Sequence, residues 1–279
     1  MHGYAEGMAD TGGGAGHAER NRALFGRVAA SYDRLGFLTL AARHLAAQVE
    51  VPAGGAVLDV ACGTGEVALG VAARGQAGRV VGTDFSPEMV RVAQARAAGL
   101  AELQVADAGA LPFPDATFEV VTCGAGLFFL PDMAAALLEW RRVLRPGGQL
   151  VFTTFGRGLL GDFPGLWRQR LAGEGLTPGS PPLGRVPDVN SALELLRAAG
   201  FVAGQARLAP LPYVVPSAEA RWADIEAGLE GDPLRALDAG TVTRLRDAHL
   251  HDLAPLFRAG PVTVPVPVLL ARGRAPGGP

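Results

Sequence analysis

The segment that most constrains the fold is a short apolar run followed at once by two glycines, Val57-Leu58-Asp59-Val60-Ala61-Cys62-Gly63-Thr64-Gly65. The run has the length of one buried strand, and the residues after Gly65 have the apolar spacing of a helix. A strand, a glycine turn and a helix in direct succession are typical of an open parallel α/β sheet. Ligands of such sheets bind beyond the carboxyl ends of the strands, so we expect residues 59–65 to form a ligand-binding loop.

Strand and helix patterns then alternate along the chain. Apolar runs predict strands over 56–60, 79–83, 103–106, 118–123 and 149–155. Helical spacing predicts helices over 66–74, 86–98 and 131–144, the second of them capped by Ser86 with Pro87 at its first position. The alternation predicts right-handed crossovers and a mostly parallel, Rossmann-like sheet with helices on both faces.

The chain is expected to divide into four stretches. Residues 1–18 are rich in Gly and Ala and are predicted to form a disordered tail. Residues 19–50 are predicted to form cap helices, and residues 51–155 the ligand-binding core. Residues 156–279 are expected to complete the sheet and to carry two lid insertions, 156–187 and 210–260.

The C-terminal stretch is less regular than the core. It predicts strands over 201–208 and 262–272 and helices over 188–199, 218–229 and 241–257. The insertion between the two strands has roughly 50 residues, and insertions of that length in a compact fold are usually functional.

A carboxylate follows each of the first three predicted strands, Asp59, Asp84 and Asp107. Asp59 would attract the ammonium group of an amino acid that also carries a sulfonium. Asp84 is placed to accept hydrogen bonds from both hydroxyls of a ribose, and Asp107 from the amino group of an adenine. Three carboxylates in this order suit a cationic nucleoside ligand.

A dinucleotide is the rival ligand for the same loop. Gly63-Thr64-Gly65-Glu66-Val67-Ala68 satisfies the pattern G-x-G-x-x-A, and Asp84 lies 21 residues after Gly63. An NAD(P)-dependent oxidoreductase would therefore fit the glycines alone. Asp59 argues against it, because a pyrophosphate at the strand end would meet a like charge.

Five segments, taken in order, resemble the motifs of one known family. They are Phe25-Gly26-Arg27-Val28-Ala29-Ala30-Ser31-Tyr32-Asp33, Leu58 to Gly65, Val81-Gly82-Thr83-Asp84-Phe85-Ser86-Pro87-Glu88-Met89, Asp107 to Phe118, and Leu144-Arg145-Pro146-Gly147-Gly148. Together they are similar to the class I S-adenosylmethionine-dependent methyltransferases, in the subgroup of the ubiquinone and menaquinone biosynthesis C-methyltransferases and their small-molecule relatives.

The resemblance implies a seven-stranded, mostly parallel sheet whose last strand is antiparallel, with 262–272 as the candidate for that strand. It implies S-adenosylmethionine as the cofactor and Tyr32 as a residue that closes the cofactor site from the N-terminal helix. One departure is visible, because Ala61 stands where many members have the first glycine of the loop. With the three carboxylates, the expected cofactor-binding residues are Tyr32, Asp59, Ala61, Gly63, Gly65, Asp84, Phe85, Met89, Asp107, Ala108 and Cys123.

Several function classes are disfavoured by what the sequence lacks. The net charge of −2 gives no electrostatic footprint for a nucleic acid. No apolar run approaches the roughly 20 residues that span a bilayer, and the two cysteines form no metal-ligand pattern. We therefore expect a cytoplasmic protein without a metal site or a membrane partner, either a monomer or a homodimer.

The expected reaction is in-line transfer of a methyl group to carbon or oxygen of a small, hydrophobic organic acceptor. Methyl transfer needs no nucleophile from the protein, and a general base is needed only if the acceptor must lose a proton. His249 and His251 in the inserted helix are weak candidates for that base. A non-catalytic protein that binds S-adenosylmethionine would carry the same motifs and remains an alternative. Aminopropyl transfer is disfavoured, because no acidic polyamine-binding motif is apparent.

Overall fold

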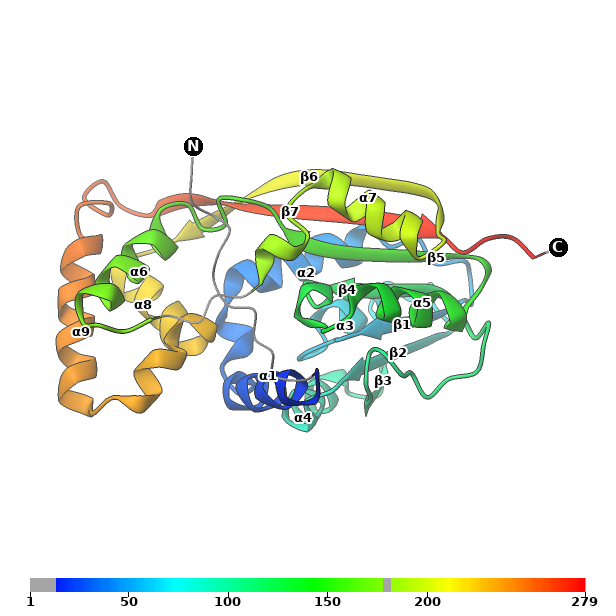
Figure 1. Cartoon of the computed structure of the whole chain (residues 1–279), viewed down its shortest axis with the longest axis horizontal. Helices are drawn as coiled ribbons and strands as arrows, with labels where there is room; N and C mark the ends of the chain where they lie inside the picture. Colours follow the sequence, from blue (N-terminus) through cyan, green and yellow to red (C-terminus); the bar gives the residue numbers. More distant parts are fainter. Residues whose placement is uncertain (1–13, 178–181, 279) are drawn as a thin grey trace.

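The computed structural model describes residues 14–177 and 182–278, and within them seven strands form one sheet (Figure 1). The strand order is β3-β2-β1-β4-β5-β7-β6. The five strands at one side pair in parallel, whereas β7 is antiparallel to both β5 and β6. The strands are β1 (Ala56–Val60), β2 (Arg79–Asp84), β3 (Glu102–Val105), β4 (Phe118–Gly124), β5 (Leu144–Phe155), β6 (Val202–Val215) and β7 (Val262–Arg274).

Helices cover both faces of this sheet because its central strands are apolar on both sides. In β1, Val57 packs with one core cluster and Leu58 with another, as the alternation of side chains in a strand requires. The cluster around Val57 includes α2 (Gly36–Gln48) and α3 (Glu66–Ala72). The cluster around Leu58 includes α5 (Met133–Val143) and α7 (Val189–Ala198).

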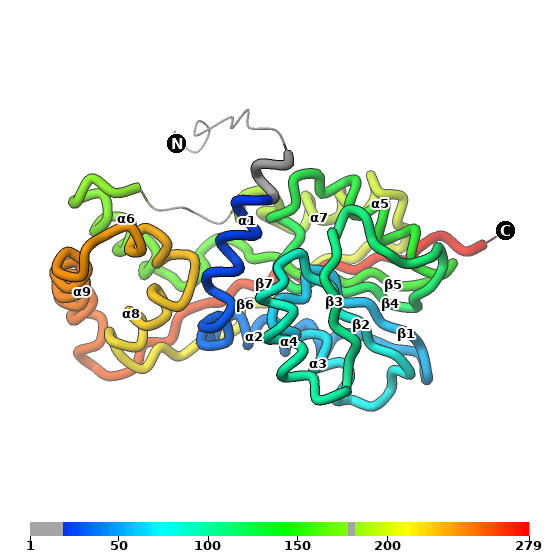
Figure 2. The backbone as a smooth tube through the Cα atoms, turned by 90° about the horizontal axis from the view of Figure 1, so that it is seen from below, coloured from blue at the N-terminus to red at the C-terminus, as the bar shows by residue number. Residues whose placement is uncertain are grey.

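Two further helices complete the part of the molecule that surrounds the sheet. Helix α4 (Pro87–Ala97) packs along β2 and β3, and the Ser86 hydroxyl accepts a hydrogen bond from the Met89 amide at its start. Helix α1 (Gly14–Val28) lies across α4 and is joined to α2 by the short helix η1 (Tyr32–Arg34) (Figure 2). The helices that precede β1 therefore reach the end of the sheet where the ligand loop was expected.

The remaining helices form a lobe beyond the end of β6 and β7, at the left of Figure 1. This lobe, which we call the α6–α9 lobe, has its own apolar cluster that includes Trp167, Trp222 and Leu245. It consists of α6 (Phe163–Gly173), α8 (Ala218–Ala227), η4 (Leu229–Ala236) and α9 (Ala239–Leu253). Two other short helices lie outside the lobe, η2 (Leu127–Phe129) between β4 and α5, and η3 (Leu183–Arg185) between α6 and α7.

The fold class, the parallel core strands and the antiparallel last strand are confirmed. Most expected bounds agree within a few residues, and the Asp188 cap of α7 is present as a capping box. No helix among the described residues is long and apolar enough to cross a membrane.

Among the four expected stretches, two bounds were wrong. Residues 14–18, expected in a disordered tail, begin α1, while residues 1–13 lie outside the described part of the chain. Residues 210–215, expected in a lid, extend β6 along β7. Pro210 and Pro212 argue against a strand when only the sequence is considered. However, β6 is an edge strand, and on its open side a missing N–H costs no hydrogen bond with a neighbouring strand.

One buried side chain fixes the loop that follows β3. Trp140 of α5 is fully buried, and its indole Nε1 donates a hydrogen bond to the Ala108 carbonyl at 2.8 Å. The bond holds residues 107–109 against the core. The position of Asp107 therefore depends on a tryptophan 33 residues further along the chain.

We predict that Trp140→Phe lowers the free energy of unfolding by about 2 kcal/mol or more, because it leaves a buried carbonyl without its donor as well as a void. Trp222→Phe is the matched control, since Trp222 is also buried but its Nε1 has no partner in the described structure. Trp222→Phe should lower the free energy of unfolding by about 1 kcal/mol less than Trp140→Phe does. Urea denaturation of both variants checks the difference, and equal costs would contradict the role given to the Trp140 bond.

Candidate functional site

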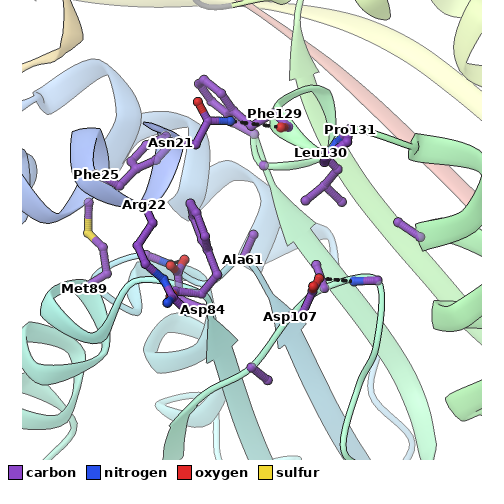
Figure 3. Close-up of a pocket in the computed structure, with 18 of the residues that line it drawn as sticks. Asn21, Arg22, Phe25, Ala61, Asp84, Met89, Asp107, Phe129, Leu130 and Pro131 are labelled. Carbon is purple, nitrogen blue, oxygen red and sulfur yellow. Dashed lines mark hydrogen bonds between the residues drawn. The ribbon is translucent and has the colours of Figure 1, made fainter. Parts of the chain in front are cut away.

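A cavity of about 680 Å³ lies at the carboxyl ends of β1, β2 and β3, beneath α1 (Figure 3). We call it the donor cavity. Asp84 and Asp107 stand on its strand side, and Asn21 and Phe25 on its helix side. Eight of the expected cofactor residues line it, namely Tyr32, Ala61, Gly63, Asp84, Phe85, Met89, Asp107 and Ala108.

The loop after β1 turns back sharply through left-handed backbone conformations. Gly63 has a φ of 54° and Gly65 a φ of 88°. Ala61 has a φ of 53°, a conformation that costs an alanine about 1–2 kcal/mol and a glycine almost nothing. A glycine at position 61 would adopt this turn without that cost, and Ala61 still permits it.

The two glycines of this loop have different surroundings. A Cβ on Gly63 would find only a ring carbon of Tyr32 at 3.9 Å, so the Gly63 backbone is open to the cavity. A Cβ on Gly65 would come within 3.2 Å of the Ala93 Cβ, which lies in α4. Gly65 does not line the donor cavity, and it serves close packing of the loop against α4.

The carboxylate of Asp84 joins the ends of β1 and β2. One of its oxygens accepts a hydrogen bond from the Gly63 amide and the other from the Ser86 amide, both at 2.9 Å. The side chain is nearly buried, and burial raises the pKa of its carboxyl. A carboxylate oxygen can accept more than one hydrogen bond, and Asp84 lines the donor cavity, so it can still accept from a ligand.

Asp59 lies deeper than expected. It is fully buried and accepts hydrogen bonds from the Thr122 hydroxyl at 2.7 Å and from the Ala68 amide at 3.2 Å. Burial raises the pKa of its carboxyl to about 7. Asp59 lines a small cavity of about 70 Å³ that shares Tyr32 and Gly63 with the donor cavity.

Asp107 stands at the opposite end of the donor cavity. Its Oδ1 accepts a hydrogen bond from the Gly109 amide at 2.8 Å, which leaves its second oxygen exposed to the cavity. The three carboxylates are thus arranged along the strand ends in the order that the sequence predicted.

An aromatic cluster on the helix side was missed by the sequence analysis. Phe25 makes edge-on contacts with Tyr32, Phe85 and Phe129, the last at 4.9 Å between ring centroids. The Asn21 amide donates to the Phe129 carbonyl, and the Arg22 guanidinium to the Phe85 carbonyl. Phe25 belongs to the first of the five motifs, which is the signal that could have assigned it to the cavity.

Asp33 was also missed, although it follows Tyr32 in the same motif. It accepts a hydrogen bond from the Thr64 hydroxyl and pairs with Arg96 at 3.1 Å. Arg96 also donates to the Thr64 carbonyl and pairs with Glu66 at the start of α3. The network fastens η1 to the loop after β1 and so holds Tyr32 over Gly63.

Tyr32 stands where the N-terminal cap meets the donor cavity. Burial, Asp84 and Asp33 raise the pKa of its phenol, which keeps the hydroxyl protonated at neutral pH. Its ring lines both the donor cavity and the small cavity beside Asp59.

Besides Gly65, three expected residues lie away from the cavities. Cys123 is fully buried in the core, and the backbone of Gly124, Ala125 and Gly126 lines the donor cavity in its place. His251 is exposed on α9. His249 is buried in the α6–α9 lobe, 5.0 Å from the Trp167 ring, and burial and Arg221 lower its pKa to about 4. The structure therefore brings neither histidine to a site of methyl transfer.

A third cavity of about 540 Å³ adjoins the donor cavity, and we call it the acceptor cavity. Tyr32, Ala125 and Phe129 line both cavities. Its other walls come from residues 35–38, from β5 and the segment after it, and from the α6–α9 lobe. They are mostly apolar, including Leu35, Phe37, Phe128, Phe155, Leu160 and Trp167.

Only a few of the side chains that line the acceptor cavity are charged. Arg157 and Arg168 are exposed, whereas Asp224 is nearly buried and Glu230 is partly buried. Within residues 14–177 and 182–278, no three His, Cys, Asp or Glu side chains are grouped to hold a metal ion.

The core of the chain is similar to known methyltransferases. Residues 58–152 match the model of a methyltransferase domain. The demethylmenaquinone methyltransferase of Bacillus licheniformis is 34% identical over 142 residues, which are 48% of this chain and 61% of that protein. A ubiquinone/menaquinone biosynthesis C-methyltransferase of a Geobacter species is 37% identical over 161 residues, 53% of this chain and 68% of that protein.

The chain spans about three-fifths of the length of the first curated relatives it matches. In the solved structure of the YcgJ protein from Bacillus subtilis the same fold is found, with a TM-score of 0.55 and 22% identity over 87% of this chain and 99% of that chain. These matches do not favour an oxidoreductase or a non-catalytic binding protein.

The five motifs, the strand order and the identity to curated relatives agree. The chain belongs to the class I S-adenosylmethionine-dependent methyltransferases, in the group that includes the ubiquinone and menaquinone biosynthesis C-methyltransferases.

Proposed function

We propose that the chain transfers a methyl group from S-adenosylmethionine to carbon or oxygen of a small, hydrophobic acceptor. The observation that carries this proposal is the meeting of two cavities at Tyr32, Ala125 and Phe129. One cavity has the polar ends that a nucleoside and an amino acid need. The other is mostly apolar and large enough for a small organic molecule.

The donor cavity offers one recognition group for each part of the donor. We propose that Asp107 and the backbone around Ala108 receive the adenine, and that Asp84 receives the ribose hydroxyls. Asp59, beneath Gly63, would attract the ammonium group from the small cavity, through a water molecule. Phe85 and Met89 supply apolar surface against the adenine ring.

This placement directs the reacting methyl group toward the acceptor cavity. When bound, S-adenosylmethionine supplies a methyl carbon activated by a sulfonium. Gly124 and Ala125 have little side-chain volume, so an acceptor can approach along the line that displacement requires. Phe25, Phe85 and Phe129 exclude water from the same region, which favours loss of the sulfonium charge during transfer.

The acceptor class follows from the lining rather than from the relatives. The relatives are named as quinone-biosynthesis methyltransferases, and a ring compound of that kind suits the apolar walls. However, the matched region ends at residue 152, whereas α6, α8 and η4 supply much of the acceptor cavity. A hydrophobic metabolite is therefore the class we propose.

We predict that Asp84→Ala lowers the affinity for S-adenosylmethionine by about 10²-fold or more, because the two hydrogen bonds that the ribose hydroxyls would donate to the carboxylate are lost. Isothermal titration calorimetry measures the change. Asp247→Ala is the control, since Asp247 is exposed on α9 and lines none of the three cavities. Unchanged affinity in folded Asp84→Ala protein would remove the ribose assignment.

We also predict methyl transfer when the protein is incubated with S-adenosylmethionine and a panel of quinols, phenols and small apolar acids. Formation of S-adenosylhomocysteine measures the turnover. A polar panel of amino acids and nucleosides should give none, because the acceptor cavity is apolar. Activity on protein or RNA alone would contradict the proposed acceptor class.

A further inference from the structure

Asp224 is the one acidic side chain in the acceptor cavity that is nearly buried and has no ion-pair partner within the described residues. Its residue is 9% exposed, and no hydrogen bond is among the causes that shift its pKa. A buried carboxylate without a donor costs free energy unless a ligand or water supplies one. The position therefore favours a ligand that brings a hydrogen-bond donor.

The rest of the cavity does not provide that donor. Arg221 lies one turn before Asp224 in α8 and is 1% exposed, but its Nη2 bonds Glu230 at 2.5 Å. Its Nε and Nη1 atoms have no partner among the described residues, and no ion pair within 4.0 Å joins it to Asp224. Arg157 and Arg168 are exposed and lie on other walls.

The contacts of α8 connect Asp224 to the segment that carries Tyr32. The Ser31 hydroxyl donates to the Ala227 carbonyl at 2.9 Å. A Cβ on Gly228 would lie 3.2 Å from a methyl group of Leu35. The last turn of α8 thus packs on residues 31–35, so Asp224 and the wall shared with the donor cavity belong to one assembled region.

From this geometry we propose that Asp224 binds a hydroxyl group of the methyl acceptor and takes its proton during transfer. This inference rests on the proposed function and specifies its acceptor class as apolar molecules that carry an acidic hydroxyl, such as a phenol or an enol. Asp224 then has the role for which the histidines of α9 are not positioned.

The step balances without another reagent. The acceptor O–H bond breaks and its proton passes to the Asp224 carboxylate. The electron pair released on oxygen, or on a ring carbon conjugated with it, forms the new bond to the methyl carbon, and the C–S pair leaves with sulfur as a thioether. After attack by carbon, that carbon loses its own proton and the hydroxyl is restored. Asp224 releases its proton to water.

The ionisation of Asp224 depends on groups from three elements. Burial raises the pKa of its carboxyl to about 6, Arg221 on the same helix opposes the rise, and Glu230 of η4 adds to it. Burial and the nearby Asp224 carboxylate raise the pKa of the Tyr213 phenol in β6, so Tyr213 stays neutral. Asp224 is therefore protonated below about pH 6 and able to accept a proton above it.

The test uses the full chain with S-adenosylhomocysteine present and two probes, 1-naphthol and 1-methoxynaphthalene, which differ at the hydroxyl. We expect the wild-type protein to bind 1-naphthol about tenfold tighter at pH 7.5, and the preference to fall below pH 6. Asp224→Asn should lose the preference while its affinity for the ether is unchanged. Glu226→Gln is the matched control, because Glu226 lies on the exposed face of the same helix.

Turnover gives the second readout. On any hydroxyl-bearing acceptor that the wild-type protein methylates, Asp224→Asn should lower kcat about 10²-fold and remove the rise of activity through pH 6, with donor affinity unchanged. A wild-type protein without the naphthol preference, or an Asp224→Asn protein that keeps the preference, would overturn the assignment. Absence of turnover with the preference intact would instead refute the proposed function and leave the Asp224 site established.

Discussion

The rest of the site depends on the hydrogen bonds that the Asp84 carboxylate makes to the Gly63 and Ser86 amides. They join the loops after β1 and β2, which are neighbours in the sheet but 21 residues apart in sequence. Because one carboxylate serves two amides, the glycine loop and the start of α4 have a fixed separation. That separation sets the width of the donor cavity and the place where Phe85 and Met89 enter it.

A second constraint acts from outside the sheet. Phe25 and Tyr32 cover the same loops, and the network of Asp33, Thr64 and Arg96 fixes the turn between α1 and α2 to the start of α3. The donor cavity is therefore closed by residues that precede β1 in the chain. The acceptor cavity is bounded by residues 35–38 of the same cap and by residues that follow β5, and it meets the donor cavity at a shared wall.

The sequence predicted the sheet and many of the residues that line the donor cavity, because both depend on local patterns. The apolar run before Gly63 predicts a strand whatever packs on it, and Asp84 lies one position after a strand end that the pattern also predicts. Cys123 illustrates the limit, since a shift of one residue along a strand moves a side chain from the cavity to the core. The prolines at 210 and 212 hid the length of β6 because their tolerance depends on an edge position that only the tertiary structure reveals.

The acceptor side could not be predicted in the same way. Asp224 lies in a helix whose apolar spacing shows no cavity, and its exposure depends on contacts with residues 31–35, nearly 200 positions earlier. His249 and His251 were weak candidates for a general base because of their place in the inserted helix, but the lobe buries the first and exposes the second away from the cavities. The chemistry of a residue type does not predict whether the fold brings that residue to a cavity.

The central claim is that the donor and acceptor cavities meet at Tyr32, Ala125 and Phe129, and a crystal structure with S-adenosylhomocysteine tests it most directly. The account predicts that the adenine lies beside Asp107, that the ribose hydroxyls contact Asp84, and that the sulfur faces the shared wall. A bound molecule whose sulfur faces away from that wall, or one that lies outside the donor cavity, would contradict the account.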